Sequence, residues 1–208
     1  KYNNKDACYD VYWSLVQDLY ERYDVEIDSA TYDLVFPYLD KGATLGDANC
    51  AYQLSYRKKY EPDSHCKRMT KEQKKKYAFR FNENYDLMFK IMDTGDTLAF
   101  NNYLTKVNDV TALPVAVLMA NRYNNGHACY LVYDIIVNKL FANNNIEIDS
   151  TSLGIAMSFL KKGATNDSYE CFSELSTLYK NGFYFSKDLK KAEEYEIKKN
   201  KCKTEICQ

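Results

Sequence analysis

The chain contains very few histidines, and this scarcity limits the catalytic chemistry that its sequence can encode. Among its 208 residues only His65 and His127 are histidines, and His127 stands two residues before Cys129. A Ser/His/Asp or Cys/His nucleophilic site would have to use one of them. Both fall near the ends of expected helices, where a surface or capping role is more common than catalysis. The sequence therefore predicts a protein that is not an enzyme and that has no cofactor.

The chain also contains seven cysteines, whose spacing is more informative than their number. Cys8 and Cys50 are 42 residues apart, and so are Cys129 and Cys171. In helical-hairpin repeats of about 40 residues, the first helices of successive hairpins are neighbours and run nearly parallel. The two cysteines of each pair would then lie at similar positions along neighbouring helices. This could bring their Cα atoms within about 7 Å, which a disulfide requires. We therefore regard Cys8–Cys50 and Cys129–Cys171 as candidate disulfides.

Other arrangements of the cysteines are open. The four paired residues could instead be small buried thiols in alanine-like positions. Cys202 could pair with Cys171 or with Cys207. No metal site is expected, because the chain contains no C-x-x-C pair. Seven cysteines in a chain of this length favour an oxidising compartment, so we expect an extracytoplasmic location, secreted or periplasmic.

The elements that would carry these residues occur twice in the chain. When the sequence is shifted by 121 positions, VEIDS at 25–29 falls on IEIDS at 146–150, and KGAT at 41–44 falls on KGAT at 162–165. The same shift places the first cysteine pair on the second. A period of 121 is too long for one hairpin. It divides into about three units of about 40 residues, which is the length of helical-hairpin repeats.

The pattern of apolar residues predicts helices throughout. Glycine and proline are scarce, and Val11, Leu15 and Leu19 follow the 3.6-residue period of a buried helix face. No strand is predicted. The expected helices are 6–22, 29–42, 48–60, 70–93, 97–107, 111–124, 128–143, 150–163, 168–181 and 188–201.

The repeated sequence motifs EIDS and KGAT predict where two of these helices begin and end. Asp28 or Ser29 would accept hydrogen bonds from the first free amides of the second helix, and Asp149 or Ser150 would do so in the later copy. The glycines at 42 and 163 would end the same helices in a left-handed conformation.

Part of the chain resembles the Sel-one-like repeat, a relative of the tetratricopeptide repeat. The segment CFSELSTLYKNGFYFSKDLKKAEEY at 171–195 matches most of that motif, and KGATLGDANCAYQL at 41–54 resembles its junction between repeats. Cys50 and Cys171 replace the small alanine that begins the motif, and Ser55 and Ser176 replace a close-packing glycine. The motif residues that fit are Leu175, Tyr179, Gly182, Asp188, Lys191, Ala192 and Tyr195.

The resemblance implies a fold and a range of functions. The fold would be an all-α, right-handed α/α superhelix, or solenoid, of about five helical hairpins that forms one domain over residues 1–208. Family members are mostly adaptors and scaffolds. Some are secreted and cysteine-rich, and one such bacterial branch is associated with penicillin binding and hydrolysis.

Aromatic and charged residues indicate where a partner would bind. Residues 6–47 have a net charge of −8 and residues 57–80 a net charge of +7, while the whole chain is near neutral at −1. The basic block has no recognised nucleic-acid motif, and no apolar run is long enough for membrane insertion. In a solenoid the first helices line the concave face, where tyrosine and tryptophan make large contacts. The predicted binding residues are Tyr9, Trp13, Tyr20, Tyr52 and Tyr56, with Lys74, Lys75 and Lys76 at the rim.

These observations predict a scaffold or adaptor that binds a protein or peptide through the concave face of the solenoid. One alternative is a secreted or periplasmic inhibitor, such as an immunity protein that caps a toxin. A second alternative is a β-lactam-binding hydrolase, which the resemblance to the cysteine-rich branch implies.

Overall fold

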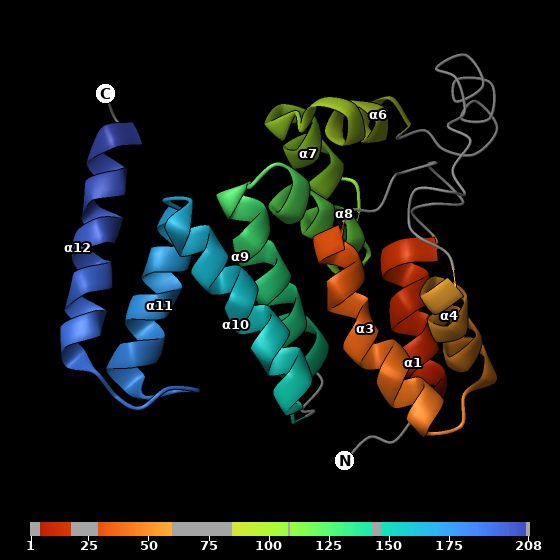
Figure 1. Cartoon of the computed structure of the whole chain (residues 1–208). Coiled ribbons are helices and arrows are strands. Elements are labelled where there is room, and N and C mark those ends of the chain that lie inside the picture. The colour runs from red at the N-terminus through yellow and green to blue at the C-terminus, as the bar shows by residue number, and fades with distance from the viewer. Residues whose placement is uncertain (1–4, 18–28, 60–84, 108, 143–146, 207–208) are drawn as a thin grey trace. The chain divides into compact units, whose positions relative to one another are not determined.

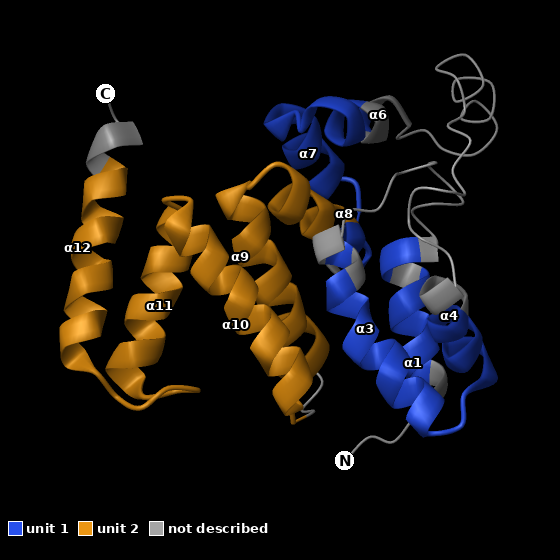
Figure 2. Cartoon of the chain, in the orientation of Figure 1, with its two compact units in different colours: residues 1–114 blue, residues 115–208 orange. Residues whose placement is uncertain are grey.

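The computed structural model describes residues 5–17, 29–59, 85–107, 109–142 and 147–206. Within these ranges every regular element is a helix, so the prediction of an all-helical protein is confirmed for the described part of the chain. The chain divides into two compact units, residues 1–114 and residues 115–208 (Figure 2). No helix in the described part is both long enough and apolar enough to cross a membrane.

The first unit contains a bundle of three helices and a separate helical pair (Figure 1). Helix α1 packs against α3, α3 packs against α4, and α1 also contacts α4, while α6 packs against α7. Buried residues of this unit include Val35, Leu39, Ile91 and Phe100. The elements are α1 (Lys5–Tyr12), the π-helix η1 (Trp13–Gln17), α3 (Ser29–Thr44), α4 (Ala48–Lys59), α6 (Tyr85–Thr94), α7 (Thr97–Leu104) and the start of α8 (Asp109–Arg122).

The second unit repeats the three-helix arrangement and adds one helix. Helix α9 packs against α10, α10 against α11, and α11 against both α9 and α12. Its core includes Tyr133, Leu160, Phe172 and Leu175, which are all nearly inaccessible to solvent. After the end of α8, the elements are α9 (Gly126–Asp134), the π-helix η3 (Ile135–Phe141), α10 (Ser150–Thr165), α11 (Tyr169–Asn181) and α12 (Leu189–Ile206).

Helices at equivalent positions begin in register in the two units. Helices α1, α3 and α4 begin 121 residues before α9, α10 and α11, respectively, and α3 and α10 each have 16 residues. In both units a π-helical segment follows the first helix. The shift that aligns the sequence therefore also aligns the local structure of the two segments.

Side-chain contacts follow the same shift. The Tyr12 hydroxyl donates a hydrogen bond to Gln53 Oε1 at 3.2 Å. At the equivalent positions the Tyr133 hydroxyl donates to Glu174 Oε1 at 2.9 Å. Each bond joins the first helix of its segment to the third, so the two segments share this contact as well as the starting positions of their helices.

The predicted cap of α10 is confirmed. Asp149 has an extended backbone, and its carboxylate accepts hydrogen bonds from the amides of Thr151 and Ser152 at 3.0 and 3.1 Å. These amides lack partners within the helix, so the carboxylate satisfies them. Asp28 and residues 18–28 as a whole lie outside the described residues, as do 70–84 of the fourth predicted helix.

The prediction that the glycines at 42 and 163 end their helices is wrong. Helices α3 and α10 continue to Thr44 and Thr165, and the left-handed residues that follow are Gly46, with φ of 84°, and Asp167, with φ of 54°. Helical backbone is open to any residue, so a left-handed conformation does not explain the glycine at either position. Glycine is instead explained at both positions by the close approach of cysteine side chains from neighbouring helices.

Candidate functional site

Two cysteine side chains meet at Gly42 in the first unit. A Cβ atom built on this glycine would overlap the Cys50 Sγ. It would also lie 2.9 Å from Cys8 Cβ and 3.1 Å from Cys50 Cβ. Since both Cβ atoms are that close to one point, they are at most 6.0 Å apart. Folding thus brings together two cysteines from the starts of α1 and α4.

The second unit has the same arrangement at Gly163. An added Cβ there would overlap the Cys171 Sγ and lie 2.9 Å from Cys129 Cβ. It would also lie 3.2 Å from the carbonyl oxygen of Gly126. The two cysteines belong to the starts of α9 and α11, so the glycine of α10 provides the space in which they meet.

These cysteines are buried thiols in the structure. Burial raises the pKa of Cys50 to about 12, with further increases from Asp47 and Cys8. Burial also raises the pKa of Cys171 to about 12 and that of Cys129 to about 11. A thiol attacks as its thiolate, so Cys50, Cys129 and Cys171 lack the lowered pKa that activates catalytic cysteines.

The other disulfide candidates differ from these two pairs. Cys202 is a partly exposed thiol whose Sγ donates to the carbonyl oxygen of Asp167 at 3.4 Å. Cys207 lies outside the described residues.

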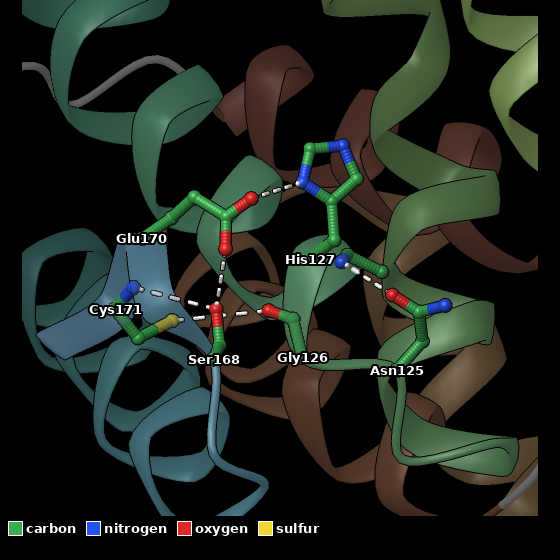
Figure 3. A network of polar contacts seen from close by, with 7 residues as sticks. Asn125, Gly126, His127, Ser168, Glu170 and Cys171 are labelled. Atoms are coloured by element: carbon green, nitrogen blue, oxygen red, sulfur yellow. Dashed lines mark hydrogen bonds and ion pairs between the residues drawn. The ribbon is translucent and has the colours of Figure 1, made fainter. Parts of the chain in front are cut away.

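A polar network joins the N-termini of α9 and α11 (Figure 3). Asn125 caps α9 by accepting from the amide of Ala128 at 2.9 Å. Ser168 caps α11 by accepting from the amide of Cys171 at 3.4 Å, and its hydroxyl donates to Glu170 Oε2 at 2.9 Å. The other oxygen, Glu170 Oε1, lies 3.2 Å from His127 Nδ1. Glu170 therefore lies between the serine and the histidine.

The network borders an open groove of about 640 Å³, which we call the His127 groove. Its lining also includes Asn166, Tyr169 and Lys203. The hydrogen bond with His127 is the largest cause that lowers the pKa of Glu170 to about 2, and the bond from Ser168 adds to it. The carboxylate is thus charged at neutral pH and complements the positive ends of two helices.

The order of the groups in this network differs from that of a serine hydrolase. A nucleophilic serine needs a base next to its hydroxyl, and that base is usually a histidine oriented by a carboxylate. Here the hydroxyl of Ser168 donates to the carboxylate of Glu170, and His127 lies on the far side of that carboxylate. Among the described residues, no group of three or more His, Cys, Asp and Glu side chains is placed to hold a metal ion.

We expect the Glu170→Gln variant to lose less stability in acid than the wild-type protein. Because the folded-state pKa is below the ordinary value of 4.5, the charged carboxylate stabilises the fold above that value, and this contribution is lost as the pH falls toward 2. The Glu170 side chain is 39% exposed, so solvent screening reduces the contribution to about 1 kcal/mol or less. Urea unfolding at pH 6 and pH 3 measures the difference, and equal losses would contradict the assignment.

The predicted aromatic binding residues are partly described. Tyr9, in α1, is half-buried, and its ring centroid lies 6.3 Å from that of Trp13. Trp13 begins η1 and is 40% exposed, and Tyr52, in α4, is 61% exposed. We call Tyr9, Trp13 and Tyr52 the aromatic surface. The side chain of Tyr56 and the whole of Tyr20, Lys74, Lys75 and Lys76 lie outside the described residues.

Sequence reasoning missed Glu170, although a signal for it was present. Contacts between residues 41 to 45 positions apart recur in the structure, including the Tyr12 hydroxyl with Gln53 Oε1 and the Cys171 Sγ with the Gly126 carbonyl oxygen. The 42-residue spacing of the cysteines is one instance of this period. Applied to His127, a separation of 41 to 45 residues points to residues 168–172, which include Glu170, 43 residues later.

No protein-family model, curated protein or solved structure matches the chain significantly.

Proposed function

We propose that the chain is a protein-interaction module rather than an enzyme, and that it binds a protein or peptide partner through the aromatic surface. The observation that carries the proposal is the exposure of Trp13 and Tyr52, at 40% and 61%, on elements next to the protein core. Exposed aromatic side chains give large contact areas at a low cost in conformational entropy, and they are enriched at binding hot spots.

The packing of α1 against α4 supports a shared binding surface. These helices are in contact, and a hydrogen bond from Tyr12 to Gln53 joins them. In the sequence, Tyr12 is adjacent to Trp13, and Gln53 is adjacent to Tyr52. Tyr9 on α1 and Tyr52 on α4 thus lie on helices that contact each other, which suits recognition because folded elements need little ordering when a partner binds.

We further propose that the hairpins belong to a right-handed α/α solenoid of the Sel-one-like type, and that the protein is extracytoplasmic, which its seven cysteines favour. The support comes from the α11–α12 pair, where Leu175 is fully buried and Gly182, with φ of 77°, ends α11. The ring of Tyr179 stacks on that of Tyr195 at 5.9 Å. These residues occupy the motif positions at which such hairpins pack and turn.

Trp13→Ala is expected to weaken partner capture from an extract of the source organism at least about tenfold while the fold survives. Replacing a fully buried tryptophan with alanine lowers the free energy of unfolding by about 3–5 kcal/mol. Trp13 is 40% exposed, so its replacement should lower the free energy of unfolding by less. Capture by immobilised wild-type and variant protein measures the effect. Ile197→Ala, on α12 with 63% exposure, is the matched control.

The single tryptophan of the chain offers a direct second readout. A bound partner should shield Trp13 from a soluble quencher of its fluorescence. Equal capture by Trp13→Ala and wild-type protein, or unchanged quenching in the complex, would contradict the assignment of this surface.

A further inference from the structure

The two units contain equivalent clusters of one glycine and two cysteines, which are Gly42 with Cys8 and Cys50, and Gly163 with Cys129 and Cys171. In each, one cysteine from the start of a first helix and one from the start of a third helix meet at a glycine of the second helix. Cys8, Cys50, Cys129 and Cys171 are all buried, with at most 5% exposure.

Hydrophobic packing alone is a poor explanation for such a cluster. Glycine in a helix interior is less favourable than alanine, and alanine is the usual small residue where helices touch. At Gly42 and Gly163, however, even a methyl group would overlap a sulfur atom. The glycines therefore make room for the two cysteine side chains, with a sulfur atom as the nearest neighbour, and they do so in both copies.

In the first unit the two cysteines are near enough for a covalent bond to need only a small rearrangement. The Cβ atoms of Cys8 and Cys50 are at most 6.0 Å apart, and a disulfide holds two Cβ atoms about 3.8 Å apart. At most about 2 Å of approach between the Cβ atoms remains, which small helix shifts can supply, and rotation about the Cα–Cβ bonds can then turn the two sulfur atoms toward each other.

We propose that Cys8–Cys50 and Cys129–Cys171 are two disulfide sites, one within each unit, and that Gly42 and Gly163 select these partners over Cys202 and Cys207. In each reaction the two cysteine thiols are oxidised to one disulfide. The oxidant is a small disulfide such as glutathione disulfide, which takes up the two hydrogens and is reduced to two molecules of glutathione. Each bond would tie the first helix of its segment to the third.

The burial of the thiols indicates that these bonds form during folding and not after it. Thiolates attack disulfides, and the pKa of Cys50 and Cys171 in the folded chain is about 12. Oxidation is therefore expected during folding, before the helices close over the sulfur atoms. Once reduced protein has folded, the same reaction is expected to be at least about tenfold slower.

The full chain, unfolded and reduced, is refolded with glutathione disulfide and digested, and the linked peptides are identified by mass spectrometry. We expect Cys8–Cys50 and Cys129–Cys171 links. Complete recovery of both pairs as thiols, or links from Cys171 to Cys202, would overturn the proposal. Protein folded first and oxidised afterwards measures the predicted slowing.

The two glycines provide reciprocal controls. Gly163→Ala should reduce the yield of the Cys129–Cys171 link at least about fivefold and leave the Cys8–Cys50 link unchanged, because the added methyl meets only atoms of the second unit, among them both cysteines of its own cluster. Gly42→Ala should have the opposite effect. Gly154→Ala, in the same helix as Gly163 with no atom near the added methyl, should change neither link. Equal yields in all three variants would overturn the role of the glycines.

Discussion

Gly163→Ala is expected to destabilise the reduced protein by about 2 kcal/mol, although alanine is the better helix former. The new methyl would overlap the Cys171 Sγ and lie 2.9 Å from Cys129 Cβ and 3.2 Å from the Gly126 carbonyl oxygen. Overpacking of this kind costs about 1–3 kcal/mol and occasionally more. The gain in helix propensity, at most about 1 kcal/mol, offsets only part of it.

Gly154→Ala is the matched control because it lies in the same helix, α10. No atom lies within 4 Å of the added methyl, and the backbone is helical. This variant should gain about 0.5–1 kcal/mol from helix propensity and from the lower entropy of the unfolded chain. Urea unfolding under reducing conditions should therefore separate the two variants by about 3 kcal/mol.

A compensating change tests the cause of the destabilisation. In the double variant Gly163→Ala with Cys171→Ala, the new methyl occupies space that the sulfur atom has left. We expect this double variant to be more stable than Gly163→Ala alone. An equal or lower stability would show that contact with the sulfur atom is not the reason for the glycine.

Tyr133→Phe is expected to cost about 2 kcal/mol, which is more than its counterpart Tyr12→Phe. The ring of Tyr133 is 1% exposed, and its hydroxyl donates to the Glu174 carboxylate at 2.9 Å. Hydrogen bonds to charged groups contribute about 1.5–3 kcal/mol, and loss of the hydroxyl leaves a carboxylate oxygen without this donor. Burial and the nearby carboxylate also raise the pKa of Tyr133, so the hydroxyl keeps its proton at all ordinary pH values.

The counterpart in the first unit has a weaker bond. Tyr12 donates to the neutral amide of Gln53 at 3.2 Å, and such bonds contribute about 0.5–1.5 kcal/mol. The two variants remove the same atom from equivalent positions, so the charge of the acceptor is the main difference. Urea unfolding of both variants measures it, and an equal loss in the two units would contradict the stronger role of Glu174.

The amino-acid sequence by itself determined the local structure of the described segments. The apolar period predicted helices at 29–42, 48–60 and 150–163, and helices occur there with ends that differ by one or two residues. Asp149 could be recognised as a cap because its partners, the amides of Thr151 and Ser152, are near in sequence. Such features depend on backbone geometry and on neighbours within one helical turn, so a short stretch of residues specifies them.

Only the tertiary structure decided what Gly163 and Glu170 do. KGAT is the kind of sequence at which helices end, yet α10 continues through it because its glycine packs against sulfur atoms from two other helices. Glu170 is unremarkable in the sequence of α11, and its role depends on His127, which lies 43 residues earlier. The sequence period indicates which residues can be neighbours across hairpins. Which atoms then meet depends on how the helices rotate and pack, and many side chains contribute to that outcome together.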